Sequence, residues 1–123
     1  MDVLTITIPA SPEYVGVVRL VVSGLASRVG FTIDDIEDLK IAVDELTAYL
    51  TGPQGRDGTL RIRFGVDDAR IEIEGAATLS DHQKVRSELT QLSRMILDTV
   101  VDDASLVHDG GQPRFTLVKT RGA

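Results

Sequence analysis

The chain contains no cysteine and no tryptophan, and only 2 of its 123 residues are histidine. Without cysteine it has no disulfide framework, no thiol nucleophile and no thiolate ligand for a metal ion. The two histidines, His82 and His108, are far apart in the sequence, and no carboxylate accompanies them at the spacing that zinc sites use. We therefore expect no metal site in this chain.

Basic residues and long apolar runs are also scarce. Lys and Arg number 13 against 19 Asp and Glu, which gives a formal net charge of −6, and the basic residues form no cluster in the sequence. This composition argues against nucleic acid as a partner, because such binding depends heavily on neutralising phosphates. No apolar run approaches the roughly 18 residues that span a bilayer, and no signal peptide opens the chain. The sequence therefore predicts a cytoplasmic protein that binds neither nucleic acid nor membrane.

Aromatic side chains make up only 4% of the chain, so the core must consist mainly of Val, Ile and Leu. Apolar residues (42%) and charged residues (26%) are near the proportions of ordinary globular proteins, and the length suits one domain covering residues 1–123. No G-x-S-x-G, P-loop or G-x-G-x-x-G motif is present. Composition and short motifs alone predict an acidic single-domain protein and no particular chemistry.

Three stretches have the apolar spacing of amphipathic helices. The first two are preceded by signals that start helices, Ser11-Pro12 in one case and Thr32 in the other. A third helix is predicted to begin at Ser80, which forms a capping box with Gln83, and to end near residue 102. The apolar positions expected to face inward are Val15, Val18, Val22, Leu25 and Val29 in the first helix, Ile36, Leu39, Val43, Leu46 and Leu50 in the second, and Val85, Leu89, Leu92, Ile96 and Val100 in the third.

Strands are predicted at residues 1–9, 60–66, 71–74, 105–107 and 115–119, with residues 75–79 as a short connection. The order is one strand, two helices, two strands, one helix and two strands. Adjacent strands suit hairpins, and three amphipathic helices can cover one face of a sheet. We therefore predict an α/β (α+β) fold, a two-layer α/β sandwich with a mixed, mostly antiparallel sheet and helices on one face.

Charged residues gather in two places, and both have a structural interpretation. Asp34, Asp35, Glu37 and Asp38 lie in the first turns of the second helix, where the helix dipole favours negative charge, so we prefer a solvated helix start to an ion site. Arg61 and Arg63 alternate with apolar residues on one strand, and Glu72 and Glu74 do so on the next. We interpret these four charges as the solvent face of a one-sided sheet.

Four segments of the chain, residues 8–15, 37–45, 63–66 and 98–103, together with Arg19, resemble the anti-sigma factor serine kinases, a branch of the GHKL ATPase superfamily. The similarity covers nearly the whole chain in order and spacing. It implies the Bergerat-type α/β sandwich. It also implies ATP-dependent phosphorylation of a serine on an anti-anti-sigma (STAS-domain) protein, and sequestration of a sigma factor by a homodimer.

The resemblance assigns roles to the residues of an ATP site, and most of them are replaced. Glu45 occupies the position of the proposed general base, but Tyr49 stands where the family has an asparagine that binds Mg²⁺. A phenol is a poor ligand for that ion. Ala77 stands at the aspartate that reads adenine, and Leu79 at the first glycine after it. The segment expected to form a lid is a short connection, and the glycine positions before the last helix hold Thr90, Gln91 and Ser93.

Two functional hypotheses follow from this pattern. The first is a degenerate anti-sigma regulator that binds a sigma factor or an anti-anti-sigma protein without ATP or Mg²⁺. The alternative, based on Glu45, is an active serine kinase that uses both cofactors. For the first, the resemblance places partner contacts on the first helix, at Arg19 with Glu13 and Tyr14. Two other interpretations are possible. Arg19 can be an ordinary exposed residue of the helix, and the whole chain can be a dimeric scaffold that binds an unrelated protein.

Overall fold

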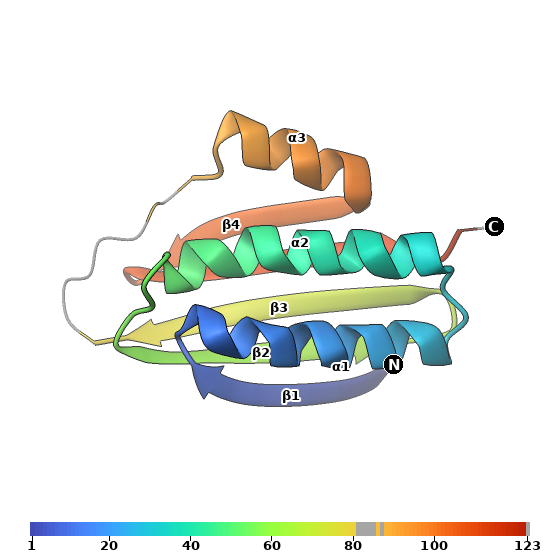
Figure 1. The fold of residues 1–123 in the computed structure, drawn as a ribbon, viewed down its shortest axis with the longest axis horizontal. Coiled ribbons are helices and arrows are strands. Elements are labelled where there is room, and N and C mark those ends of the chain that lie inside the picture. Colours follow the sequence, from blue (N-terminus) through green and yellow to red (C-terminus); the bar gives the residue numbers. More distant parts are fainter. Residues whose placement is uncertain (81–85, 87, 123) are drawn as a thin grey trace.

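A computed structural model of the chain describes residues 1–80, 86 and 88–122. Five strands form one sheet in the order β1-β2-β3-β5-β4, and each neighbouring pair is antiparallel. Three helices lie over one face of this sheet, with α1 and α2 side by side (Figure 1). The predicted order of elements and the two-layer α+β fold are confirmed, and the described strands are antiparallel throughout. The elements are β1 (Asp2–Pro9), the short 3-10 helix η1 (Pro12–Tyr14), α1 (Val15–Arg28), α2 (Ile33–Thr51), β2 (Gly58–Val66), β3 (Arg70–Leu79), α3 (Gln91–Val100), β4 (Asp103–Asp109) and β5 (Gln112–Thr120).

The ends of α2 are fixed by side chains. At its start, the Thr32 hydroxyl accepts a hydrogen bond from the Asp35 backbone N–H at 3.1 Å, as the capping signal predicts. At its end, Gly52 has a φ of 65°, which an L side chain rarely adopts. The Arg56 guanidinium then donates to the carbonyls of Tyr49 and Leu50 at 3.3 and 3.4 Å, so it satisfies two acceptors that the helix leaves open.

The third helix begins later than predicted, at Gln91 and not at Ser80. Its cap is Thr90, whose hydroxyl accepts from the Ser93 N–H at 3.0 Å, whereas the Ser80 hydroxyl donates to an oxygen of Asp57 at 2.8 Å. Leu92, predicted to face inward, is 66% exposed, because Ser93 and Leu97 form the buried side of the shorter helix. The predicted positions Gln83 and Val85 lie outside the described residues.

Residues 75–79 are not a connection but the second half of β3, paired with β2 from Gly58 to Ile62. Small residues hid this strand, because Gly75 and the two alanines after it give no alternating pattern. Gly75 is required there, since a Cβ atom would lie 2.2 Å from the Phe115 ring. The segment that joins β3 to α3 is residues 80–90, so the predicted short connection is wrong.

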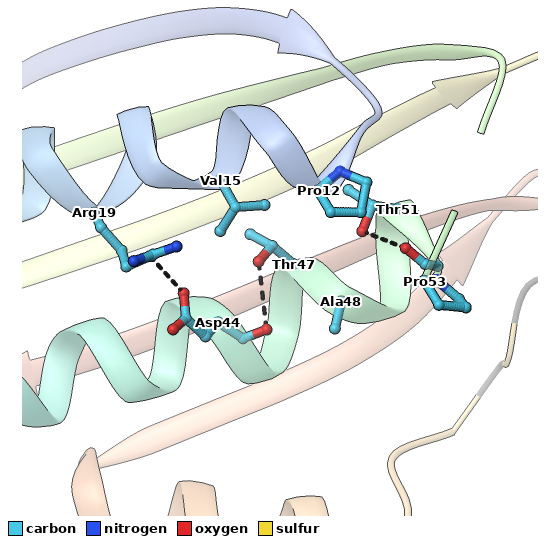
Figure 2. Close-up of a pocket in the computed structure, with 9 residues that line it drawn as sticks. Pro12, Val15, Arg19, Asp44, Thr47, Ala48, Thr51 and Pro53 are labelled. Carbon is cyan, nitrogen blue, oxygen red and sulfur yellow. Dashed lines mark hydrogen bonds and ion pairs between the residues drawn. The ribbon is translucent and has the colours of Figure 1, made fainter. Parts of the chain in front are cut away.

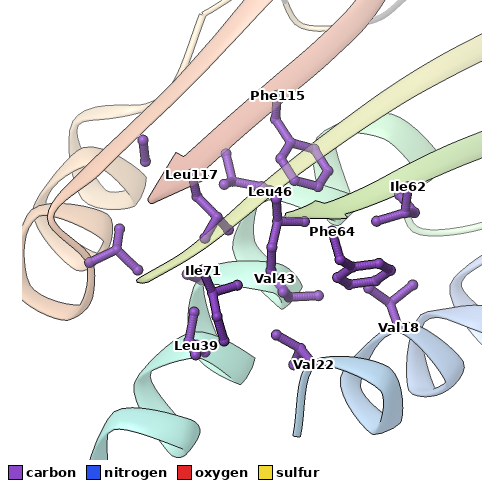
Figure 3. Close-up of a cluster of buried hydrophobic side chains, with 14 of the residues drawn as sticks. Val18, Val22, Leu39, Val43, Leu46, Ile62, Phe64, Ile71, Phe115 and Leu117 are labelled. Atoms are coloured by element: carbon purple, nitrogen blue, oxygen red, sulfur yellow. The ribbon is translucent and has the colours of Figure 1, made fainter. Parts of the chain in front are cut away.

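The core lies between the helices and the inner face of the sheet, as Figure 3 shows. It consists mainly of aliphatic side chains, as the low aromatic content predicts, and its buried phenylalanine rings are Phe31, Phe64 and Phe115. None of the described helices combines the length and the apolar character that crossing a membrane requires. The largest fully buried side chains are Phe64, Phe115, Leu39, Leu46, Leu50, Leu60, Ile62, Ile71, Ile73, Leu97, Leu117 and Val18.

A buried cation explains part of the acidic start of α2. Lys119 on β5 is only 9% exposed, and its ammonium group donates to the Val100 carbonyl at 2.7 Å. The same nitrogen lies 3.7 Å from a carboxylate oxygen of Asp35 and 3.7 Å from one of Asp38. Lys119 therefore ties the start of α2 to the end of α3, a contact that the sequence pattern does not reveal.

Candidate functional site

Glu45 and Tyr49 lie one turn apart on α2, and both reach the first turn of α3. The Tyr49 hydroxyl donates to the Ser93 hydroxyl at 2.7 Å and accepts from the Thr90 backbone N–H at 2.9 Å. Ser93 in turn donates to a carboxylate oxygen of Glu45 at 3.0 Å. The result is a directed chain of hydrogen bonds that starts at a helix N-terminus and ends on a carboxylate.

This chain of hydrogen bonds changes the acidity of the phenol. Burial raises the pKa of Tyr49, but hydrogen bonds with Ser93 and Thr90 and the nearby charge of Arg86 outweigh that effect, so the pKa lies below its ordinary value. The phenol oxygen also satisfies the Thr90 N–H, one of the donors that a helix start leaves open. A helix N-terminus is a common binding place for anions. Here Tyr49 occupies it from within the protein.

The other two positions that the resemblance assigns to nucleotide binding lie on β3. Ala77 and Leu79 are both buried on the inner face of the sheet, and neither side chain carries a polar atom. The backbone of Leu79 is held by the Gln112 side chain, which accepts from its N–H at 2.8 Å and donates to its carbonyl at 3.3 Å. The sequence does not reveal this role of Gln112, because nothing in the spacing of residues links β5 to the end of β3.

Arg19, Glu13 and Tyr14 are the predicted partner-binding residues, and of these Arg19 lines a hollow. Its Nε atom is 3.0 Å from a carboxylate oxygen of Asp44, and both side chains are about half exposed. The pair lies beside a hollow of ≈400 Å³ between α1 and the C-terminal half of α2, shown in Figure 2. Apart from this pair the lining is mostly apolar or uncharged: Pro12, Val15, Thr47, Ala48, Thr51, Gly52 and Pro53.

Glu13 and Tyr14, the two other predicted partner contacts, lie on η1 and are exposed, but they do not line this hollow. The structure thus places Arg19 with Asp44 and an apolar groove, and leaves Glu13 and Tyr14 at the entry to α1. The sequence pattern does not single out Asp44, although this residue comes directly before Glu45. Among the described residues, no three His, Cys, Asp or Glu side chains gather closely enough to hold a metal ion.

Comparison with known proteins finds many relatives and no matching family model. The chain is 50% identical over 76 residues to the serine-protein kinase RsbW of Bacillus velezensis, and the aligned region covers 59% of this chain and 48% of that protein. It is 37% identical over 108 residues to RsbW of Bacillus licheniformis, and the aligned region covers 85% of this chain and 66% of that protein. It is 32% identical over 122 residues to RsbW of Bacillus cereus strain B4264, and the aligned region covers 85% of this chain and 76% of that protein.

The matches cover different shares of the related proteins. The chain spans about half the length of the first curated relatives it matches, and three quarters of the Bacillus cereus protein. A crystal structure of the RsbU and RsbW domains of a Mycobacterium tuberculosis protein superimposes on the whole chain with a TM-score of 0.67. That match has 19% identity and covers 34% of the other chain, so it supports the fold.

Proposed function

The chain belongs to the RsbW family of serine-protein kinases, and from that premise we propose that it is an anti-sigma regulator that has lost the family's catalysis. In this proposal it acts in the cytoplasm by binding a sigma factor, an anti-anti-sigma STAS-domain protein or both. It does so without productive binding of ATP or Mg²⁺, and therefore without transferring phosphate.

The observation that carries the proposal is the contact between Tyr49 and the first turn of α3. The resemblance places the Mg²⁺ ligand at Tyr49 and the phosphates near the start of the last helix. In this chain the phenol hydroxyl occupies that helix start through Thr90 and Ser93. A nucleotide phosphate would need to displace both hydrogen bonds. Binding it there would therefore leave buried polar groups to find new partners.

The composition of the site supports the same conclusion. Ala77 offers no acceptor for an adenine amino group, and Leu79 has a buried apolar side chain where the family has glycine. A site built to recognise a hydrogen-bonding group loses selectivity when that partner is absent. Glu45 is already hydrogen-bonded to Ser93, and a general base contributes to catalysis only when the reacting group is positioned beside it. These residues do not fit the Mg²⁺-ATP complex that the family uses.

Partner binding is proposed at Arg19 and the adjoining hollow between α1 and α2. An arginine fork binds carboxylates in a bidentate manner, and its present carboxylate partner, Asp44, is half exposed and can be displaced. The apolar part of the hollow, next to Val15 and Ala48, can receive an aliphatic side chain beside that carboxylate. We propose that an acidic residue of the sigma factor or antagonist replaces Asp44 at Arg19.

A homodimer is also part of the proposal. β1 is an edge strand of the sheet, and α1 next to it carries exposed apolar residues, with Leu20 75% exposed and Val17 half exposed. Unpaired strand edges and exposed apolar patches are both places where a second copy can pack. In sedimentation velocity, Leu20→Glu should turn a dimer into a monomer, and a monomeric unsubstituted protein would contradict this part.

The functional experiment uses the purified chain with a candidate sigma factor and a candidate STAS-domain protein from the same cell. Pull-down with the chain as bait should recover one of them, and Arg19→Ala should abolish recovery. The exposed Arg28→Ala at the other end of α1 is the matched control and should not change it. Recovery of neither protein, with unrelated proteins captured from the cell lysate instead, would overturn the proposal in favour of a scaffold.

One observation favours a second candidate function, the active serine kinase. Glu45 is present at the position of the general base, and Ser93 holds its carboxylate in a defined orientation. If this candidate is correct, the chain transfers phosphate from ATP to a STAS-domain protein and Glu45→Ala abolishes transfer. Absence of transfer by the unsubstituted chain, with an active Bacillus RsbW as positive control, removes it.

A further inference from the structure

A second hollow lies on the face of the sheet opposite the helices, and arginine dominates its lining. It has a volume of ≈300 Å³ and is lined by Arg61, Arg63, Glu74, Ala76 and Arg114. The cross-strand register sets their arrangement: Ala76 on β3 lies between Arg61 on β2 and Arg114 on β5. The small alanine side chain forms the floor, and the arginines rise from the strands on either side.

Two of these arginines differ from most others in the chain. Arg19, Arg56 and Arg121 are each held by a carboxylate or by backbone carbonyls. In the part of the chain that the structure describes, the side chains of Arg61 and Arg63 have no hydrogen-bond or ion-pair partner. Glu74 is the cross-strand neighbour of Arg63, yet the two side chains are not within ion-pair distance. The guanidinium groups of β2 are therefore available to a ligand.

The charge and spacing of this surface indicate the kind of ligand. Arg61 and Arg63 carry two positive charges beside the single glutamate of the lining, so this part of the surface is locally positive in a chain whose net charge is −6. Residues two apart on a strand are about 6.6 Å apart, and carboxylates at alternate positions of an extended segment have the same spacing. Thr5 and Thr7 on β1 lie directly beside Arg63 and Arg61, and they add hydroxyl groups at the rim.

We propose that this open sheet face, centred on Arg61 and Arg63, binds an extended acidic segment of a partner protein, with carboxylates at alternate positions. Each arginine fork would hold one carboxylate. A nucleic acid fits less well, because it needs many phosphate contacts and the acidic molecule as a whole repels a long polyanion. The surface is on the other side of the sheet from Arg19 and Asp44, so it goes beyond the function proposed above.

The test is a titration of the isotope-labelled chain, followed by NMR. The probe is a short synthetic peptide in which glutamate alternates with threonine, and the control peptide has glutamine in place of glutamate. We expect shifts of the amides of β2, β3 and β5 around Ala76, and a Kd that rises with ionic strength. The double variant Arg61→Gln/Arg63→Gln should weaken binding about tenfold. Arg28→Gln, an exposed arginine on the helical side, should leave it unchanged.

Several results would overturn the proposal. These are an absence of shifts, shifts located between α1 and α2, equal binding of the glutamine peptide, and equal binding by the double variant. Inorganic tripolyphosphate that causes the same shifts at equal charge would assign the surface to phosphate anions instead. Thermal unfolding of the double variant verifies that it is folded. Pull-down through Arg19 should be unaffected, so failure here is distinguishable from failure of the anti-sigma proposal.

Discussion

The Tyr49 hydroxyl on α2 and the Ser93 hydroxyl on α3 lie 2.7 Å apart, and this contact joins two helices at the place where the family's nucleotide site is expected. The bond is one link in a longer chain, because Tyr49 also accepts from Thr90 and Ser93 donates to Glu45. Linked hydrogen bonds strengthen one another in a partly buried site. The contact therefore stabilises the fold, and we propose that it also closes the nucleotide site.

Removing the phenol hydroxyl should destabilise the protein. Tyr49→Phe leaves the Thr90 N–H without its acceptor and removes the donor to the Ser93 hydroxyl, so we expect the free energy of unfolding to fall by about 1–3 kcal/mol. Urea denaturation followed by circular dichroism measures it. Tyr14→Phe removes a hydroxyl from an exposed residue and is the control. Equal stabilities for Tyr49→Phe and the unsubstituted chain would show that the hydrogen bonds contribute nothing.

The ion pair between Arg19 and Asp44 should compete with the partner. Asp44→Asn releases Arg19, and because an exposed pair contributes at most about 1 kcal/mol, the affinity for the sigma factor or STAS-domain protein should rise by about two- to fivefold. Surface plasmon resonance with the immobilised partner measures the change. If Asp44→Asn weakens binding as much as Arg19→Ala does, Asp44 itself contacts the partner and the displacement idea is wrong.

Lys119 should contribute more to the free energy of unfolding than an exposed lysine does. Lys119→Met removes the cation near Asp35 and Asp38 and the donor to the Val100 carbonyl, so we expect a loss of about 1–3 kcal/mol in unfolding free energy. Lys40→Met, which breaks only the pair with Glu37 on the surface of α2, should change stability by less than about 0.5 kcal/mol. Chemical denaturation at neutral pH compares them, and equal losses would contradict the role of Lys119.

Stability should fall in acid partly through Asp102. Hydrogen bonds from the Thr120 hydroxyl and backbone N–H, both at 2.6 Å, hold the pKa of Asp102 below its usual value, with burial opposing and Lys119 assisting. A carboxyl whose pKa is lower in the folded state adds stability above its unfolded pKa and loses it as the pH falls through the folded one.

The measurement is the free energy of unfolding between pH 7 and pH 2.5 for the unsubstituted chain and for Asp102→Asn. The variant should be less stable at neutral pH, and its stability should decline less steeply below about pH 4. Asp68→Asn, at an exposed acid in the turn between β2 and β3, controls for the change in net charge. Curves that differ by a constant amount over the whole range would exclude the linkage.

Local patterns were sufficient for much of the fold. Apolar steps of three and four predicted α1 and α2, and the cap at Thr32 was confirmed by its hydrogen bond. Period-two alternation predicted β1 and β2. These patterns gave wrong predictions in two situations. Small side chains concealed part of a strand, and apolar helical spacing began in the sequence before the helix itself begins. Gly75 concealed the second half of β3, and Ser80 offered a capping signal that the structure uses for a contact with Asp57.

The candidate site was only partly predictable, and for a different reason. The resemblance brought attention to Glu45, Tyr49 and the residues before α3, but spacing carries no information on which distant hydroxyls meet. Tyr49 and Ser93 are joined only because α2 and α3 pack side by side. The pairing of Arg19 with Asp44 likewise depends on how α1 and α2 are rotated against each other. Contacts between helices require the packed structure.

We propose that Tyr49, with Ala77 and Leu79, prevents nucleotide binding to this chain. Isothermal titration calorimetry of the purified chain with ATP and Mg²⁺ tests this exclusion, with the serine-protein kinase RsbW of Bacillus velezensis as the positive control. We expect no heat of binding for this chain at nucleotide concentrations that saturate the control. Saturable binding with a micromolar Kd would contradict it.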